Sequence, residues 1–109
     1  MDRAVVVELV KRYADRVRKD FDVKKVILFG SHAEGTAGED SDIDVAVVFE
    51  SIDEDYLDVI TRLSKIRRDV DHRIEPVALE ELNDKSGFLK EIIKLGVIIY
   101  VRDRTVPGE

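Results

Sequence analysis

The sequence predicts a small α/β (α+β) domain built on one mixed β-sheet of about four strands with flanking helices. Its length of 109 residues is that of a single domain with a single core. Segments with helical period alternate with short apolar runs, which is the pattern of helices interleaved with strands. A composition of 44% hydrophobic and 39% charged residues is typical of a globular domain that folds.

The first half of the chain predicts one long helix and two strands. Asp2 is a good N-cap for a helix that runs to about Lys19, with apolar residues three and four positions apart. The apolar run Lys25–Phe29 is too short for a helix and fits a buried strand. The following stretch, 30–38, holds three glycines and permits a tight turn with at most one helical turn. A second strand is expected at Asp42–Phe49, where alternating polar and apolar residues are followed by a continuous apolar run.

The second half predicts two helices and two strands. Apolar residues spaced three and four positions apart predict a helix from Asp53 to Val70. A third strand is expected at His72–Leu79, and Pro76 within it indicates an edge position or a bulge, because proline cannot donate to a neighbouring strand. A helix at 88–95, stopped by a glycine, and a last strand at 97–101 complete the fold.

Composition excludes several classes of function. The chain has no cysteine, which removes disulfides, thiolate nucleophiles and zinc–thiolate sites. It has no apolar run long enough for a membrane span and no signal peptide, so a cytoplasmic protein without membrane contact is expected. The net charge of −6 argues against direct nucleic-acid binding, which needs a basic surface. A polyanionic ligand would therefore require a cation.

Two carboxylates at the start of the second strand are the clearest chemical signal. Asp42 and Asp44 are separated by one residue, so in a strand they project from the same face. Such a pair is repulsive at neutral pH unless a cation or a shared proton relieves it. Oxygen ligands of this kind suit Mg²⁺, which takes its remaining ligands from water and phosphates. The alternative for an isolated pair is simple solvation at a strand end.

The turn before these carboxylates supplies a second signal. Gly30 allows close backbone approach, and Ser31 adds a hydroxyl and an N–H at the start of a short helix, an arrangement that can hold an anion. Taken alone, the pair Gly30-Ser31 is equally an ordinary strand-to-helix turn. A phosphate cradle and a carboxylate pair on neighbouring strands are together the two halves of a metal–nucleotide site.

Two-metal phosphoryl chemistry calls for a third carboxylate opposite the pair. Glu75 is the preferred candidate, because it lies mid-strand among apolar neighbours, where a carboxylate without a partner is costly. Asp71 has the same strand parity and is the rival candidate, although it lies nearer the end of the preceding helix. Two roles are considered for His32. It is either a contact to phosphate or base or, as the preferred expectation, a structural or exposed side chain.

Together these residues resemble a known family. Gly30-Ser31 through Gly35, followed by Ser41-Asp42-Ile43-Asp44 and an apolar run, is similar to the signature of the DNA polymerase β nucleotidyltransferase superfamily and most of all to its minimal nucleotidyltransferases. The resemblance implies the nucleotidyltransferase fold over residues 1–102. Residues 103–109, with Pro107 and Gly108, are expected to form a frayed tail. The resemblance also implies that Gly30 and Ser31 bind the triphosphate, that Asp42 and Asp44 bind nucleotide and Mg²⁺, and that Glu75 is the third catalytic and metal-binding acid.

Two departures from the family pattern stand out. The third acid is more commonly Asp than Glu, and Glu34 occupies a position that is often Arg in minimal members. Minimal members typically pair with a small helical HEPN toxin, as antitoxins that adenylylate a toxin tyrosine. The resemblance thus implies an Mg²⁺-dependent, two-metal transfer of AMP from ATP to a tyrosine of a HEPN partner, within a hetero-oligomer. Two alternatives stay open: a noncatalytic nucleotide-binding subunit that occludes its partner, and a small-molecule nucleotidyltransferase.

Overall fold

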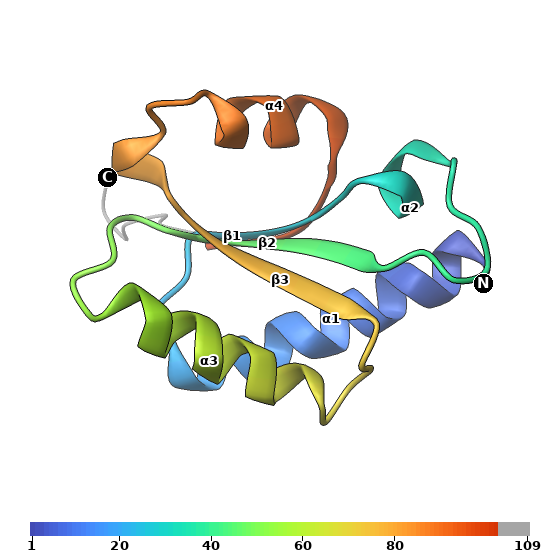
Figure 1. Cartoon of the computed structure of the whole chain (residues 1–109), viewed down its shortest axis with the longest axis horizontal. Coiled ribbons are helices and arrows are strands. Elements are labelled where there is room, and N and C mark those ends of the chain that lie inside the picture. Colours follow the sequence, from blue (N-terminus) through green and yellow to red (C-terminus); the bar gives the residue numbers. More distant parts are fainter. Residues whose placement is uncertain (103–109) are drawn as a thin grey trace, which may run out of the picture.

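A single four-stranded sheet organises the computed structural model (Figure 1). Its strands are β1 (Lys25–Phe29), β2 (Ile43–Phe49), β3 (Ile74–Glu80) and β4 (Val97–Val101), in the spatial order β3-β2-β1-β4. β1 is antiparallel to both β2 and β4, whereas β2 and β3 are parallel. The structure describes residues 1–102, and the tail expected to fray at 103–109 lies outside them.

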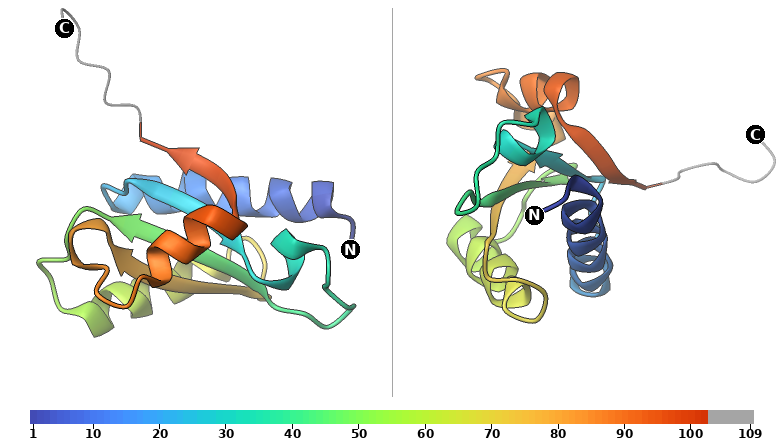
Figure 2. Two further views of the ribbon diagram at one scale, coloured as in Figure 1. Left: turned by 90° about the horizontal axis from the view of Figure 1, so that it is seen from above. Right: turned by 90° about the vertical axis from the view of Figure 1, so that its right-hand side faces the viewer.

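Helices cover both faces of this sheet (Figures 1 and 2). The long helices α1 (Arg3–Asp20) and α3 (Tyr56–Arg67) lie on one face. The helix α4 (Phe88–Leu95) lies on the other face, and a short 3₁₀ turn at Glu81–Asn83 precedes it. The single turn α2 (Ser31–Glu34) follows the end of β1, and its Ala33 is buried in the core that α1 and α3 cover. This is the mixed α/β architecture that the sequence predicts.

Alternating side chains divide the core into two parts. Val45 and Val47 of β2 point to the large core under α1 and α3, which also contains Leu63. Ala46 and Val48 point the opposite way, to a smaller cluster completed by β1 and α4. Asp44 has the parity of Ala46 and Val48, so its side chain belongs to the face that carries α4.

Strand register brings the chemistry-bearing residues into one row. Asp44 on β2 is the direct partner of Phe29 on β1 and of Glu75 on β3. β3 is an edge strand, which confirms the edge position expected from Pro76. The row lies at the end of the sheet where β1 leads into α2, a connection visible in Figure 1.

The helix boundaries differ from the predicted ones for local reasons. Asp2 caps α1 as expected, with its carboxylate accepting from the Ala4 N–H at 3.1 Å, and the helix ends one residue later than predicted. The third helix starts at Tyr56 rather than Asp53, because Asp55 accepts from the Leu57 N–H and forms the cap. It stops at Arg67, so Val70 lies in the turn that follows.

The boundaries of β2 and β3 also shift. β2 begins at Ile43, which leaves Asp42 just outside the strand. β3 begins at Ile74 rather than His72, because the Asp71 carboxylate accepts from the Arg73 N–H and holds the preceding residues in a turn. None of the helices within residues 1–102 combines the length and the apolar character that crossing a bilayer requires.

Candidate active site

Three carboxylates lie near the N-terminal ends of β2 and β3. Asp44 faces Glu75 directly across the parallel strand pair, and Asp42 lies two residues before Asp44, in the loop that leads into β2. Asp42 and Glu75 are exposed, whereas Asp44 is half-buried. The structure therefore brings together the three acids that the sequence selected.

The Asp44 carboxyl group has an unfavourable environment for negative charge. Burial raises the pKa of Asp44 above its usual value, and the neighbouring charges of Asp42 and Glu75 raise it further, while His32 acts in the opposite direction. Crowded carboxylates of this kind are stabilised by a bound cation.

The glycine at the end of β1 is required by the same carboxylate. Gly30 has φ +75° and ψ −154°, a conformation that side chains rarely adopt. A Cβ atom at this position would lie only 2.3 Å from Oδ2 of Asp44, so the space over Gly30 is filled by the carboxylate. α2 begins at the next residue, Ser31, whose N–H lies at the start of the helix and has no acceptor within it. The proposed phosphate cradle thus touches Asp44, one member of the carboxylate pair.

Glu75, the candidate third acid, forms an ion pair with Arg67. Nη1 of Arg67 lies 3.1 Å from Oε1 of Glu75 and also donates to the carbonyl oxygen of Ile74 at 2.9 Å. Half of the Glu75 side chain remains exposed. The carboxylate is thus partly neutralised but still reachable from solvent. No pattern in the sequence connects Arg67 with this site.

The rival acid, Asp71, has a different arrangement. Its two carboxylate oxygens accept from Nε and Nη2 of Arg73 at 2.9 and 2.7 Å and from the Arg73 backbone N–H. These bonds lower the pKa of Asp71 to about 2. Asp71 therefore closes the turn before β3, whereas Glu75 is the residue that lies opposite Asp44.

Comparison with known proteins assigns the family. The family described as "Polymerase beta, Nucleotidyltransferase" matches residues 11–105. The chain belongs to this family. The resemblance inferred from the glycine–serine and Asp-x-Asp motifs is thereby confirmed, together with the predicted fold and the class of enzyme.

Individual relatives agree with this assignment. The chain is 29% identical over 104 residues to protein adenylyltransferase MntA of Thermococcus cleftensis, covering 88% of this chain and 92% of the relative. A solved structure from Sulfolobus solfataricus, described as "a putative nucleotidyltransferase", has a TM-score of 0.72 and 25% identity, covering 94% of this chain and 86% of that one. A toxin-antitoxin crystal structure with AMP-PNP has a TM-score of 0.66 and 20% identity, covering 85% and 74%.

His32 has a structural position in this nucleotidyltransferase. It is 8% exposed, and its Nε2 lies 3.3 Å from the carbonyl oxygen of Ser41. Since a carbonyl only accepts, Nε2 is the donor, and the bond ties α2 to the loop that carries Asp42. His32 also lines a hollow of about 190 Å³ together with Ser31 and Arg3. Arg3, which the sequence analysis did not single out, brings a positive charge close to Ser31.

The chemistry of the carboxylates suits a divalent cation. Within residues 1–102, no three acidic or histidine side chains already converge as a ready-made metal cluster. Asp42 and Asp44 nevertheless offer hard oxygen ligands in a site with excess negative charge, and Mg²⁺ characteristically takes one or two carboxylates and completes its shell with water and substrate phosphates. The residues present therefore fit Mg²⁺ bound together with a nucleotide.

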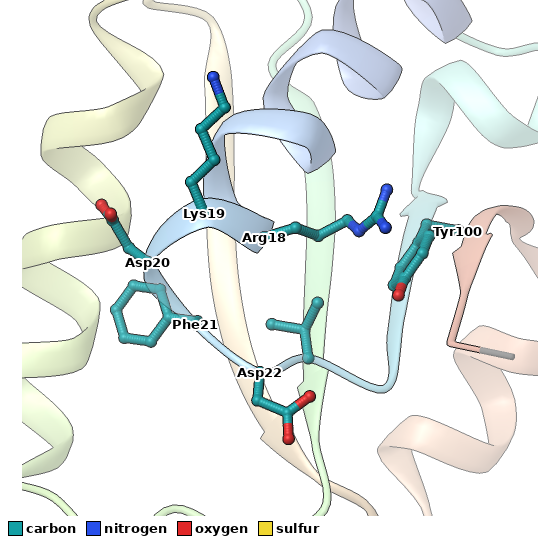
Figure 3. Close-up of a pocket in the computed structure, with 7 residues that line it drawn as sticks. Arg18, Lys19, Asp20, Phe21, Asp22 and Tyr100 are labelled. Atoms are coloured by element: carbon teal, nitrogen blue, oxygen red, sulfur yellow. The ribbon is translucent and has the colours of Figure 1, made fainter. Parts of the chain in front are cut away.

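A separate cavity lies at the far end of α1 (Figure 3). It has a volume of about 420 Å³ and is lined by residues 18–23 and Tyr100, and the guanidinium of Arg18 stacks 4.1 Å above the Tyr100 ring. Arg3, at the other end of the same helix, borders Ser31, so the cavity and the Gly30-Ser31 turn lie at opposite ends of α1. Its walls carry charges of both signs, and it is not part of the nucleotidyltransferase site.

Proposed function

We propose that the protein is an Mg²⁺-dependent nucleotidyltransferase that transfers AMP from ATP to a tyrosine hydroxyl of a partner toxin of the HEPN type. The observation that carries the proposal is the contact between the Asp44 carboxylate and the Gly30 backbone, with Asp42 and Glu75 beside it. One compact site thereby offers ligands for metal and for phosphate.

Each residue of the site has a distinct task in this proposal. The backbone at Gly30 and Ser31 binds and orients the triphosphate. Asp42 and Asp44, with Glu75 for a second ion, are the ligands that would hold Mg²⁺. Bound Mg²⁺ supplies charge neutralisation at the phosphates and favours deprotonation of the attacking hydroxyl. Glu75 orients the acceptor hydroxyl and accepts its proton, while the oxygen bonds to the α-phosphorus and pyrophosphate departs.

The choice of ATP and of a protein acceptor is supported by the relatives. One is named a protein adenylyltransferase, and a structural neighbour is a toxin-antitoxin crystallised with AMP-PNP. A phenolic hydroxyl has a pKa near 10 and is easier to deprotonate beside a metal than an aliphatic one. Between Val26 and Thr61 the chain has ten carboxylates and no lysine or arginine, which favours a basic partner surface over RNA.

The test is a transfer reaction that uses the protein encoded beside this one as the candidate toxin. The two proteins are incubated with ATP and Mg²⁺, and the toxin is scanned by mass spectrometry for added AMP on tyrosine. We expect modified tyrosine with the wild type and none with Asp42→Asn or Asp44→Asn. Modification that continues unchanged in both variants would place the chemistry elsewhere.

A second candidate function is occlusion of the partner without catalysis. The ion pair between Arg67 and Glu75 favours it, because a third acid held by a guanidinium is less available as a base or ligand. Under this hypothesis the toxin loses activity on forming the complex while every tyrosine stays unmodified. The same mass spectrometry, combined with a toxin activity assay, separates the two functions.

A further inference from the structure

A small cavity opens directly beside the proposed phosphate cradle. It has a volume of about 160 Å³ and is bounded by Phe29 and Gly30 at the end of β1, by Glu34 on α2 and by one side of α4. α4 packs on the face of the sheet that also carries Asp44 (Figure 1), and Glu34 at the end of α2 reaches the same cavity. Gly30 is therefore shared between the cavity and the carboxylate site.

The walls of this cavity are mainly aromatic and aliphatic. Phe29 and Phe88 meet edge to face, with ring centroids 5.9 Å apart and an angle of 89° between the rings. Phe88 is 45% exposed although it belongs to an apolar wall, and Leu95 beside it is 50% exposed. An exposed aromatic ring at the edge of an apolar cavity is a platform on which a planar group can stack.

Two carboxylates complete the lining. Glu34 approaches from α2 and Glu91 from α4, so the acidic groups stand on both helices that border the cavity. An ionised carboxylate only accepts hydrogen bonds and pairs with N–H donors. The cavity thus matches a flat apolar molecule that carries an amino group on its edge.

We propose that this cavity binds the adenine base of the nucleotide, with Phe88 as the stacking platform and Glu34 or Glu91 accepting from the 6-amino group. The inference rests on the proposed function, because Gly30 and Ser31 must hold the triphosphate of the same molecule. It gives Glu34 a task in base selection. Phosphate binding and base binding are then separate properties of neighbouring residues.

Binding measurements separate the base from the triphosphate. Calorimetry with Mg²⁺ compares ATP with inorganic tripolyphosphate, which has no base. We expect Phe88→Ala to weaken ATP binding by about tenfold, the effect of losing one aromatic stacking partner, and to leave tripolyphosphate binding unchanged. Ile93→Ala is the matched control, because Ile93 is exposed on the same helix but does not line the cavity. Its ATP affinity stays at the wild-type value.

A second measurement tests the carboxylates. Purine riboside triphosphate lacks the 6-amino group, and the wild type is expected to bind it about tenfold more weakly than ATP. The double variant Glu34→Ala/Glu91→Ala binds the two nucleotides equally. If ATP affinity is the same in Phe88→Ala and the wild type, the base-binding assignment is overturned while the proposed function stands. If the wild type binds neither ATP nor tripolyphosphate, the proposed function fails as well.

Discussion

Arg67 on α3 and Glu75 on β3 form an ion pair at the edge of the candidate site, with 3.1 Å between Nη1 and Oε1. The same nitrogen donates to the carbonyl oxygen of Ile74, so the guanidinium is anchored to the strand as well as to the carboxylate. Arg67 thus places a positive charge next to Glu75 and fixes the direction of its carboxylate beside Asp44.

The first prediction concerns turnover in the Glu75→Gln variant. The change keeps the size of the side chain and its hydrogen bond to Arg67 but removes the negative charge and most of the basicity. We expect kcat to fall by about a hundredfold or more, whereas the affinity for Mg²⁺-ATP changes little, because the lost interaction is made mainly in the transition state. Steady-state transfer kinetics and calorimetry measure the two quantities.

Asp71→Asn is the matched control for this variant. Asp71 is bound to Arg73 and closes the turn before β3, so its loss should leave kcat close to the wild-type value. The assignment is reversed if Asp71→Asn loses turnover and Glu75→Gln does not.

The part of the site that is local in sequence was predictable. Gly30, Asp42 and Asp44 lie within residues 30–44, but β2 begins at Ile43, so the strand period fixes the face of Asp44 and not that of Asp42. Glu75 was selected over Asp71 by an expected mid-strand position among apolar neighbours. It is instead the exposed second residue of β3, and the parallel register sets it opposite Asp44. Capping by Asp2 was likewise predictable, since it depends on neighbouring residues only.

Contacts between distant segments were not predictable in the same way. The pairing of Arg67 with Glu75 depends on how the turn between α3 and β3 folds back, which neither apolar period nor propensity encodes. The cavity beside Gly30 forms only because the fold brings α4 next to the end of β1 and to Glu34 of α2. The predicted start of α3 was too early. Three of the four residues at 53–56 are acidic and suit a helix N-terminus, so the sequence alone does not identify Asp55 as the cap.

The second prediction is that Asp42→Asn and Asp44→Asn each abolish Mg²⁺-dependent ATP binding without unfolding the protein. Each change removes a charged ligand, which should lower affinity by more than about tenfold. The metal-free Asp44→Asn variant should melt at or above the wild-type temperature, because burial and the charges of Asp42 and Glu75 disfavour the ionised carboxyl at residue 44. Calorimetry with and without EDTA, together with thermal melting, checks both parts. A lower melting temperature for metal-free Asp44→Asn would contradict the assigned repulsion.

The third prediction separates backbone strain from a clash at the site. Gly30→Ala and Gly35→Ala both place a Cβ on a residue with positive φ, so each should cost about 1–3 kcal/mol of stability. Only Gly30→Ala brings the new Cβ onto the Asp44 carboxylate, whereas nothing lies within 4 Å of a Cβ at Gly35. We expect both variants to unfold at lower denaturant concentration and only Gly30→Ala to lose Mg²⁺-ATP binding. Equal loss of binding in both would show that the α2 turn as a whole, rather than the carboxylate contact, is responsible.

The fourth prediction is an acid-dependent contribution of Asp71 to stability. Its pKa is lowered from the ordinary value of 3.8 to about 2, chiefly by the side-chain hydrogen bonds from Arg73. A carboxyl group whose pKa is lower in the folded state stabilises the fold above its ordinary pKa, and this stabilisation is lost as the pH falls from about 4 to 2. Asp71→Asn should therefore be less stable than the wild type by about 1 kcal/mol at pH 7, and the difference should shrink toward zero near pH 2. Denaturant unfolding at pH 7, 4, 3 and 2 measures it. A difference that stays constant over this range would mean that the hydrogen bonds to Arg73 stabilise the turn independently of the charge on Asp71.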